Sequence, residues 1–241
     1  LNIHTIYLAA GIYSPSTNGE TFPISWSNYV NLSGSSENET TLDADNTAGV
    51  MMFFYVTHAS VENITITNGS NSGIYFRDSS PSLENVTISG NTATDSKGGG
   101  FYEDSSGTFS NNYVLNNTGG GIYSQNGQSS ITGNIIAGNT GGALYYKHQS
   151  GDSKSVSNNT IFNNTGSPVV YLKSESSNGS LEVRNNTIVG NSGSPTVSLG
   201  KSSSANAPVF SDNNIYGNSG TYELENTTAL GTGDLNVENN Y

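Results

Sequence analysis

The chain has 241 residues, and about half of them are Ser, Thr, Asn or Gly, with 38, 24, 34 and 29 copies respectively. Nineteen acidic against seven basic residues give a net charge of −12, which excludes nucleic-acid binding, because a polyphosphate partner needs a basic face. The chain has no cysteine, which excludes disulfides and thiolate metal sites, and no apolar run long enough for membrane insertion.

Residues 1–60 contain four strand-like segments without a regular spacing. They are TIYLAAGIYS from Thr5, YVNLSG from Tyr29, TTLDA from Thr40 and VMMFFYV from Val50. We expect two or three irregular first coils of a larger structure here. The last segment has an alternative role, as a cap across the open end of the core.

From Val61 onward the sequence repeats. Seven copies, 22 to 27 residues apart, each begin with an apolar residue, and five residues later each carries a β-branched one. The expected core stack formed by these second residues is Ile66, Ile88, Val114, Ile136, Ile161, Ile188 and Ile215. An incomplete eighth copy starts at Val237. A fixed spacing of this length predicts a solenoid of stacked coils.

Each copy also contains a second short apolar run, such as GIYF from Gly73 or ALYY from Ala143. These runs are too short for helices, and their bulky and β-branched residues favour strands. We therefore predict an all-β fold, a single-stranded parallel β-helix of about ten coils of 22–27 residues. Residues 1–60 form its irregular first coils, and residues 61–241 form the regular ones within one continuous domain. A β-sandwich is the alternative, but it would not explain an asparagine at a fixed offset in each copy.

Asparagine occupies two columns of the repeat. Stacked amides can bond from coil to coil, and asparagine also tolerates left-handed backbone at turns. The predicted interior amide ladder consists of Asn112, Asn134, Asn159, Asn186 and Asn213. The predicted turn asparagines are Asn91, Asn117, Asn139, Asn164, Asn191 and Asn218.

Several motifs resemble known surface proteins. The runs GGGI at 119–122 and GGAL at 141–144, with the Phe-x-x-Asn units at Phe109 and Phe210, resemble the repeats of polymorphic outer-membrane proteins and pectate-lyase-like proteins. The opening at residues 6–34 resembles the first coils of a family of surface β-helices of undefined function. The resemblance implies a right-handed helix, an extracellular or cell-surface location, and structural or adhesive roles. The family also contains enzymes.

The sequence offers no clear catalytic constellation. A lyase of the pectate type combines clustered carboxylates with a basic residue, and a hydrolase needs converging carboxylates. The two arginines, Arg77 and Arg184, fall about five coils apart, and the acids are scattered. Asp43 and Asp45 are the best acidic pair. We interpret them as part of a solvated turn, and a weak cation site is the alternative. We expect no other cofactor. His4, His58 and His148 are isolated, at expected surface or groove positions.

Asn-x-Ser/Thr sequons mark candidate glycosylation sites. There are eleven of them, only slightly more than composition alone would give. Asn38 and Asn178 are the best candidates because they lie in loop-like stretches. Further candidates are Asn31, Asn68, Asn116, Asn163 and Asn226. The remaining four, Asn63, Asn85, Asn158 and Asn185, share one position of the repeat, where stacking at ~4.8 Å would crowd their glycans.

Tyrosine recurs in the second run of five copies, at Tyr75, Tyr102, Tyr123, Tyr145 and Tyr171. These residues form either an exposed stripe, suited to carbohydrate or protein contact, or a partly buried stack. A β-helix also exposes strand edges at its ends, which predicts end-to-end pairing with copies of itself. A fragment lacking its remaining coils is the alternative.

We predict a non-enzymatic, exported cell-surface protein that is structural or adhesive and that assembles into filaments or a sheath. Its expected partners are copies of itself and surface glycans or proteins. The alternative function is a polysaccharide lyase, glycoside hydrolase or carbohydrate-binding module on the same scaffold.

Overall fold

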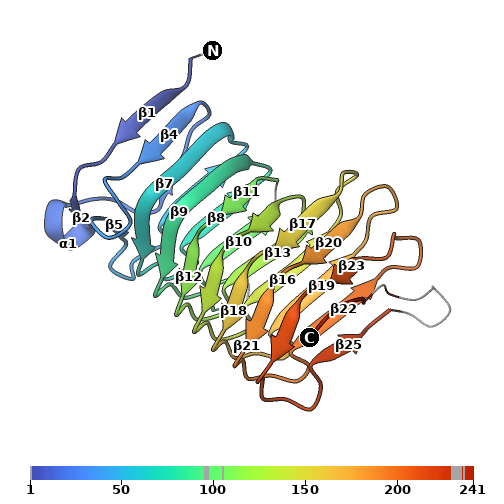
Figure 1. Cartoon of the computed structure of the whole chain (residues 1–241). Coiled ribbons are helices and arrows are strands. Elements are labelled where there is room, and N and C mark those ends of the chain that lie inside the picture. The colour runs from blue at the N-terminus through green and yellow to red at the C-terminus, as the bar shows by residue number, and fades with distance from the viewer. Residues whose placement is uncertain (1, 95–97, 105, 229–234, 236) are drawn as a thin grey trace.

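Strands of successive coils lie side by side and run in the same direction in the computed structural model, from the first coil to the last (Figure 1). Residues about two dozen apart are direct neighbours, as Ile136, Ile161 and Ile188 show by pairing in parallel register. The structure describes residues 2–94, 98–104, 106–228, 235 and 237–241, with backbone alone for 102–104. The predicted parallel β-helix is confirmed.

Within the described residues, the first sheet has sixteen strands. Its members are β1 (His4–Tyr7), β2 (Gly11–Tyr13), β4 (Val30–Ser33), β5 (Thr40–Asp43), β7 (Thr57–Thr67), β9 (Ser80–Ser89), β11 (Thr108–Ser110), β12 (Tyr113–Leu115), β14 (Ser130–Thr132), β15 (Ile135–Ala137), β17 (Lys154–Ser157), β18 (Thr160–Phe162), β20 (Leu181–Arg184), β21 (Thr187–Val189), β23 (Val209–Ser211) and β24 (Asn214–Tyr216). The long strands β7 and β9 each pair with two shorter strands of a neighbouring coil.

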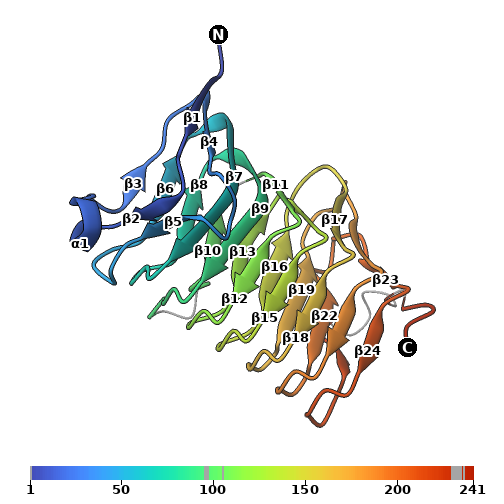
Figure 2. The same ribbon diagram turned by 60° about the vertical axis from the view of Figure 1, so that its left-hand side comes forward.

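The second sheet has nine described strands, about one for each coil (Figure 2). They are β3 (Ile24–Ser25), β6 (Met51–Phe54), β8 (Ile74–Arg77), β10 (Phe101–Asp104), β13 (Ile122–Gly127), β16 (Leu144–His148), β19 (Val170–Ser174), β22 (Val197–Lys201) and β25 (Leu224–Asn226). The described solenoid has about eight turns, slightly fewer than the ten expected.

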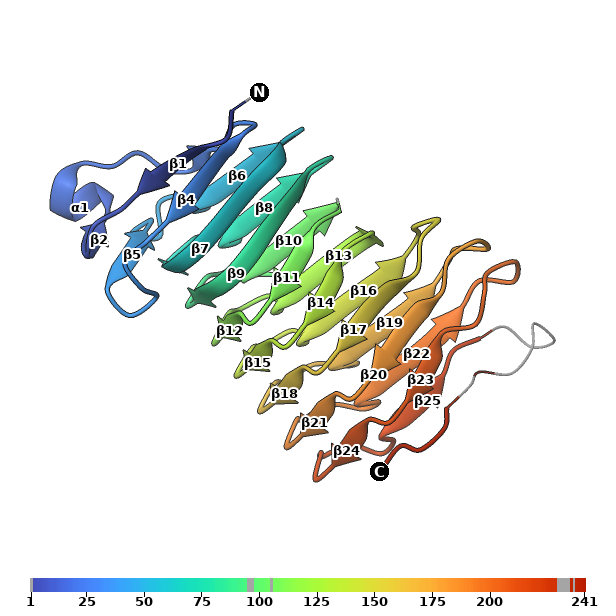
Figure 3. The ribbon, with the colours of Figure 1, turned by 45° about the horizontal axis from the view of Figure 1, so that its top comes forward.

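The structure decides between the two roles that the sequence left open for the segment VMMFFYV. The segment VMMFFYV forms β6, which pairs with β3 and β8, so it belongs to a coil and does not cap the core. Its inward side chains Met51 and Phe53 are buried. A short helix, α1 (Pro15–Asn18), follows β2 at the same end of the solenoid (Figure 3). No helix among the described residues is long and apolar enough to cross a membrane.

The interior is filled by like residues that stack on one another. The residues from Ile66 to Ile188 in the expected core stack are fully or almost fully buried, and each pairs with the next. Ile215, in the last of these coils, is only partly buried. Phe76, Phe101 and Phe109 pack together with centroid separations of 4.4 to 5.9 Å. This apolar column stabilises the fold, because it removes β-branched and aromatic surface from water.

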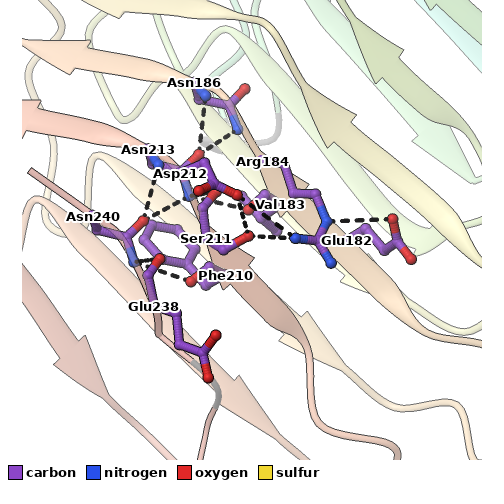
Figure 4. A network of polar contacts seen from close by, with 10 residues as sticks. All are labelled: Glu182, Val183, Arg184, Asn186, Phe210, Ser211, Asp212, Asn213, Glu238 and Asn240. Carbon is purple, nitrogen blue, oxygen red and sulfur yellow. Dashed lines mark hydrogen bonds and ion pairs between the residues drawn. The ribbon is translucent and has the colours of Figure 1, made fainter.

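Both asparagine columns form buried amide ladders. In the predicted ladder, the Asn112 Nδ2 donates to Asn134 Oδ1 at 3.1 Å, and the same bond recurs down to Asn213. The ladder continues to Asn240, at 3.0 Å from Asn213 (Figure 4). The six predicted turn asparagines form a second ladder with the same geometry, beginning with Asn91 donating to Asn117 at 3.1 Å.

The left-handed backbone therefore lies one residue earlier than expected from the sequence. The residue before each ladder asparagine has a positive φ, for example 57° at Asn111 and 67° at Gly138. This kink turns the following amide inward, where its backbone N–H also donates to the next coil's Oδ1. Asn or Gly stands at nearly every kink because both tolerate that conformation.

Candidate functional site

A groove runs along the outward face of the second sheet, over β13, β16 and β19. It has a volume of about 590 Å³, and we call it the tyrosine groove. It is lined by Gly98, Gly120, Ile122, Tyr123, Gly141, Gly142, Leu144, Tyr145, Ser167, Pro168, Val169 and Tyr171. Such a concave surface, with apolar walls and a few polar groups, is typical of ligand sites.

The floor of the groove is a stack of three tyrosine rings. The ring centroids of Tyr123 and Tyr145 are 4.3 Å apart at 7°, and those of Tyr145 and Tyr171 are 4.6 Å apart at 10°. The rings repeat because their residues are in direct register in the parallel sheet. Since the stacked faces cover one another, the groove receives mainly ring edges and phenolic hydroxyls. Of the stripe predicted from the sequence, Tyr75 lies further along the sheet, and the side chain of Tyr102 lies outside the described residues.

Four glycines at the corners of the coils, Gly98, Gly120, Gly141 and Gly142, also line the groove. Gly120 and Gly142 both have a φ of 107°, which other residues rarely adopt. A Cβ at Gly141, which also lines the groove, would lie only 3.0 Å from the backbone nitrogen of Gly120 in the preceding coil. The corners are therefore bare, and the groove stays open along the solenoid axis.

Two lysines continue the tyrosine column along the same strands. Lys147 and Lys173 lie in register, two residues beyond Tyr145 and Tyr171, and both pair with Glu175, at 3.3 and 2.8 Å. These are two of only seven basic residues in a chain of net charge −12. This cluster was not predicted from the sequence, although a lysine two residues after a tyrosine in consecutive copies was a visible signal.

The titration of this cluster follows from burial and pairing. Burial raises the pKa of Tyr145, and the neighbouring Tyr123 and Tyr171 raise it further. Burial also raises the pKa of Tyr171, so both phenols stay protonated at neutral pH. Burial alone would raise the pKa of Glu175, but hydrogen bonds from Lys173, Gln149 and Lys147 outweigh burial and lower this pKa. The cluster thus carries two ammonium groups and one carboxylate.

The carboxylates of the chain do not converge in this groove. None of the described residues that line it is acidic. Arg77 and Arg184 lie on different sheets, on β8 and β20, and share no site. In Figure 4, Arg184 turns toward Ser211 and Asp212, with Glu182 on its other side. Over the described ranges, no three His, Asp or Glu side chains are placed to hold a metal ion.

Asp43 and Asp45 already have hydrogen-bond donors. The Asp43 carboxylate accepts from the backbone of Asp45 at 2.8 Å and from Asn68 Nδ2 at 2.9 Å. Asp45 accepts from the backbone of Ser16 at 2.8 Å. Both carboxylates fix the turn after β5, and this bonding is the role that the geometry gives them.

The three histidines occupy different environments. His4 is exposed, and His58 stacks on Tyr29 with centroids 4.9 Å apart. His148 is instead completely buried, which differs from the expected surface or groove position. Its Nε2 lies 3.0 Å from the carbonyl oxygen of Asp152, and its Nδ1 has no hydrogen-bond partner. Burial lowers its pKa, so the imidazole is neutral at pH 7.

The candidate glycosylation sites divide by exposure. Asn38 and Asn178 are exposed, as are Asn116, Asn163 and Asn226. Asn68 differs, because its amide nitrogen donates to Asp43. Asn31 is half-buried, and its side-chain oxygen accepts from Ser60 at 3.0 Å. Glycosylation of the exposed sites stays a prediction.

A comparison of the sequence with models of protein families identifies the family of this chain. The family model described as a right-handed β-helix region matches residues 24–157 and 101–241. The chain belongs to the right-handed β-helix family. This bears out the resemblance seen in the sequence and gives the solenoid its hand.

Two solved structures are similar to the chain at low sequence identity. An alginate lyase from Paenibacillus sp. str. FPU-7 is 14% identical, with a TM-score of 0.50 over 98% of this chain and 88% of the lyase. ORF18 of Geobacillus virus E2 is 15% identical, with a TM-score of 0.39 over 98% of this chain and 52% of that one. None of the curated proteins matches the sequence. The likeness to the lyase describes the fold alone, and one fold can host several unrelated functions.

Proposed function

We propose that this protein is a non-enzymatic, exported, adhesive β-helix that binds an extended polysaccharide in the tyrosine groove. The observation that carries the proposal is an open groove across three coils, with tyrosines on its floor and no carboxylate among its described lining residues. A polymer bound along the solenoid axis would meet one tyrosine per coil. The phenolic oxygens can accept from sugar hydroxyls while the ring edges contact the sugar's apolar face, and the Tyr123 hydroxyl itself donates to Gln125 Oε1 at 2.6 Å.

The lysine cluster favours an anionic chain. Lys147 and Lys173 together carry one more positive charge than Glu175 neutralises, beside the groove of an otherwise acidic protein. Uronate polymers present one carboxylate per sugar and complement such a row of ammonium groups. The lyase of similar fold is named for alginate, and this uronate polymer is therefore the first to test.

Binding without cleavage is the expected behaviour. Hydrolysis needs a pair of carboxylates flanking the scissile bond, and calcium-assisted elimination needs a carboxylate cluster. The described groove has neither, and the carboxylate of the neighbouring cluster, Glu175, is held by Lys173 and Gln149. A catalytic groove would leave its acid available to substrate.

The experiment is affinity electrophoresis and calorimetry of the purified chain with alginate and a neutral glucan. In parallel, assays for unsaturated uronate and for reducing sugar measure cleavage. We expect binding of alginate, weaker binding of the glucan, and no product. Product release above the level of a Tyr145→Ala variant would refute the non-enzymatic proposal.

Two variants distinguish binding in the tyrosine groove from nonspecific binding elsewhere on the protein surface. Tyr145→Phe keeps the ring stack and removes one hydroxyl, and we expect an affinity loss of about tenfold, equal to ~1.4 kcal/mol. Tyr113→Ala removes a 40% exposed tyrosine from the first sheet and should leave binding unchanged. If both variants bind like the parent, the tyrosine groove is not the binding site. End-to-end assembly of copies stays a separate prediction, which light scattering at increasing concentration tests.

A further inference from the structure

A second hollow lies on the outward face of the same sheet, over β6 and β8. It has a volume of about 660 Å³, and we call it the N-terminal hollow. Its floor includes Met52, Phe54 and Tyr75, and its sides come from the corner loops 47–49 and 70–72. A concave site of this size, with apolar side chains on its floor and polar groups at its sides, suits a small organic ligand.

The floor is chemically unlike that of the tyrosine groove. Both methionines of the chain line the hollow, although only two are present in 241 residues. The Phe54 ring is 40% exposed and lies 5.5 Å from the Tyr75 ring at a tilt of 58°, whereas the groove tyrosines stack in parallel. Methionine is flexible and makes favourable contacts with aromatic rings. Phe54 and Met52 therefore favour an apolar ring over a polar sugar.

One cation stands beside this apolar floor. Arg77 is the only charged side chain among the described residues lining the hollow. Its Nε is 3.7 Å from the Asp78 carboxylate, beyond hydrogen-bond distance, and its side chain is 54% exposed. The guanidinium thus keeps donors for a second carboxylate, which it can bind in bidentate fashion.

We propose that the N-terminal hollow binds a small aromatic carboxylate. The ring packs on Met52 and Phe54, and the carboxylate pairs with Arg77. An apolar floor alone would bind any hydrophobic molecule, and the charge of Arg77 makes the hollow selective for a carboxylate. This inference does not depend on the polysaccharide proposal, because it concerns other residues and another class of ligand.

The test is calorimetry with benzoate, and with benzamide as the neutral molecule of the same shape. We expect benzoate to bind at least tenfold more tightly than benzamide at low salt. Arg77→Gln should lower the affinity for benzoate to that for benzamide and leave benzamide unchanged. Arg184→Gln, on the other sheet, is the matched control and should leave both affinities unchanged.

Further variants keep the test independent of folding. Arg77→Lys should retain part of the preference for the acid, while Ala48→Phe, which fills the hollow from its side, should abolish binding with Arg77 still in place. Circular dichroism melting curves confirm that each variant is folded. Equal affinities for benzoate and benzamide, no benzoate binding at millimolar concentration, or tighter binding of glucuronate than benzoate would each overturn the proposal.

Discussion

Replacing Asn139 by alanine tests whether the buried amide ladders stabilise the solenoid. The Asn139 Oδ1 accepts from the backbone and the side chain of Asn117, at 2.9 and 3.0 Å, and its Nδ2 donates to the Val114 carbonyl and to Asn164 Oδ1, both at 2.9 Å. After truncation, the Asn117 side chain still has the Ile88 carbonyl as a partner, and Asn164 Oδ1 still accepts from the backbone of residue 139.

The expected cost follows from the groups that lose these bonds. The backbone N–H of Asn117 and the carbonyl of Val114 lose these ladder partners in a dry interior. At about 1–3 kcal/mol for each unsatisfied group, the free energy of unfolding should fall by about 4 kcal/mol. Asn139→Asp should be at least as destabilising at pH 7, because its carboxylate would face two acceptor oxygens.

The assay is equilibrium urea unfolding followed by circular dichroism. Asn214→Ala is the matched control, because Asn214 is an exposed asparagine on the first sheet, and it should change the free energy of unfolding by less than about 0.5 kcal/mol. If Asn139→Ala falls within about 1 kcal/mol of this control, or if the aspartate variant is as stable as the parent, the ladder is not a source of stability.

Three further predictions concern pH, packing and charge. Burial lowers the pKa of His148 below its ordinary 6.5, so on acidification the imidazole of the unfolded chain is protonated before that of the folded chain. The free energy of unfolding should therefore be highest above pH 6.5 and fall as the pH drops below 6.5. Urea unfolding from pH 7.5 to 5 measures this dependence, and His148→Gln should remove it. A Cβ at Gly193 would overlap the carbonyl oxygen of Gly166, so Gly193→Ala should cost about 2–3 kcal/mol in the same assay, whereas Gly151→Ala, with no atom within 4 Å, should be neutral. Glu175→Gln frees two lysines, so alginate should bind several-fold more tightly at low salt and lose that gain at high salt, and an unchanged affinity would refute the role of the cluster.

The coil architecture could be predicted from the sequence because each solenoid position repeats the same environment. Ile136 and Ile161 occupy the same position in their copies of the repeat, so a solenoid must stack one on the other. The parallel pairing of β15 with β18 shows that they are stacked. The interior role of Asn139 was not predicted, because asparagine is common both at left-handed turns and in buried ladders. Sequence spacing alone does not tell which of two adjacent residues takes the kink.

The candidate site was harder to predict because it depends on side-chain direction and on corners between strands. The recurrence of Tyr145 and Tyr171 was visible, but whether the rings lay exposed or packed together depended on their stacking at 4.6 Å. The pairing of Lys147 with Glu175 joins residues of neighbouring coils, and nothing in their local sequence indicates it. The burial of His148 likewise depends on its place in a strand whose alternate residues face the core.

The ladders also give the molecule an electrostatic polarity. Every side-chain amide points its N–H₂ toward the C-terminal neighbour and its oxygen toward the N-terminal one, so the small dipoles add head to tail instead of cancelling. The positive pole of the second ladder is at Asn218, whose amide donates to the carboxylate of Glu223 at 2.9 Å. As with the macrodipole of an α-helix, negative groups are favoured at that pole and positive groups at the other. Each added coil would lengthen this aligned array in the same sense, and mutual polarisation along the chain of amides would strengthen every bond in it.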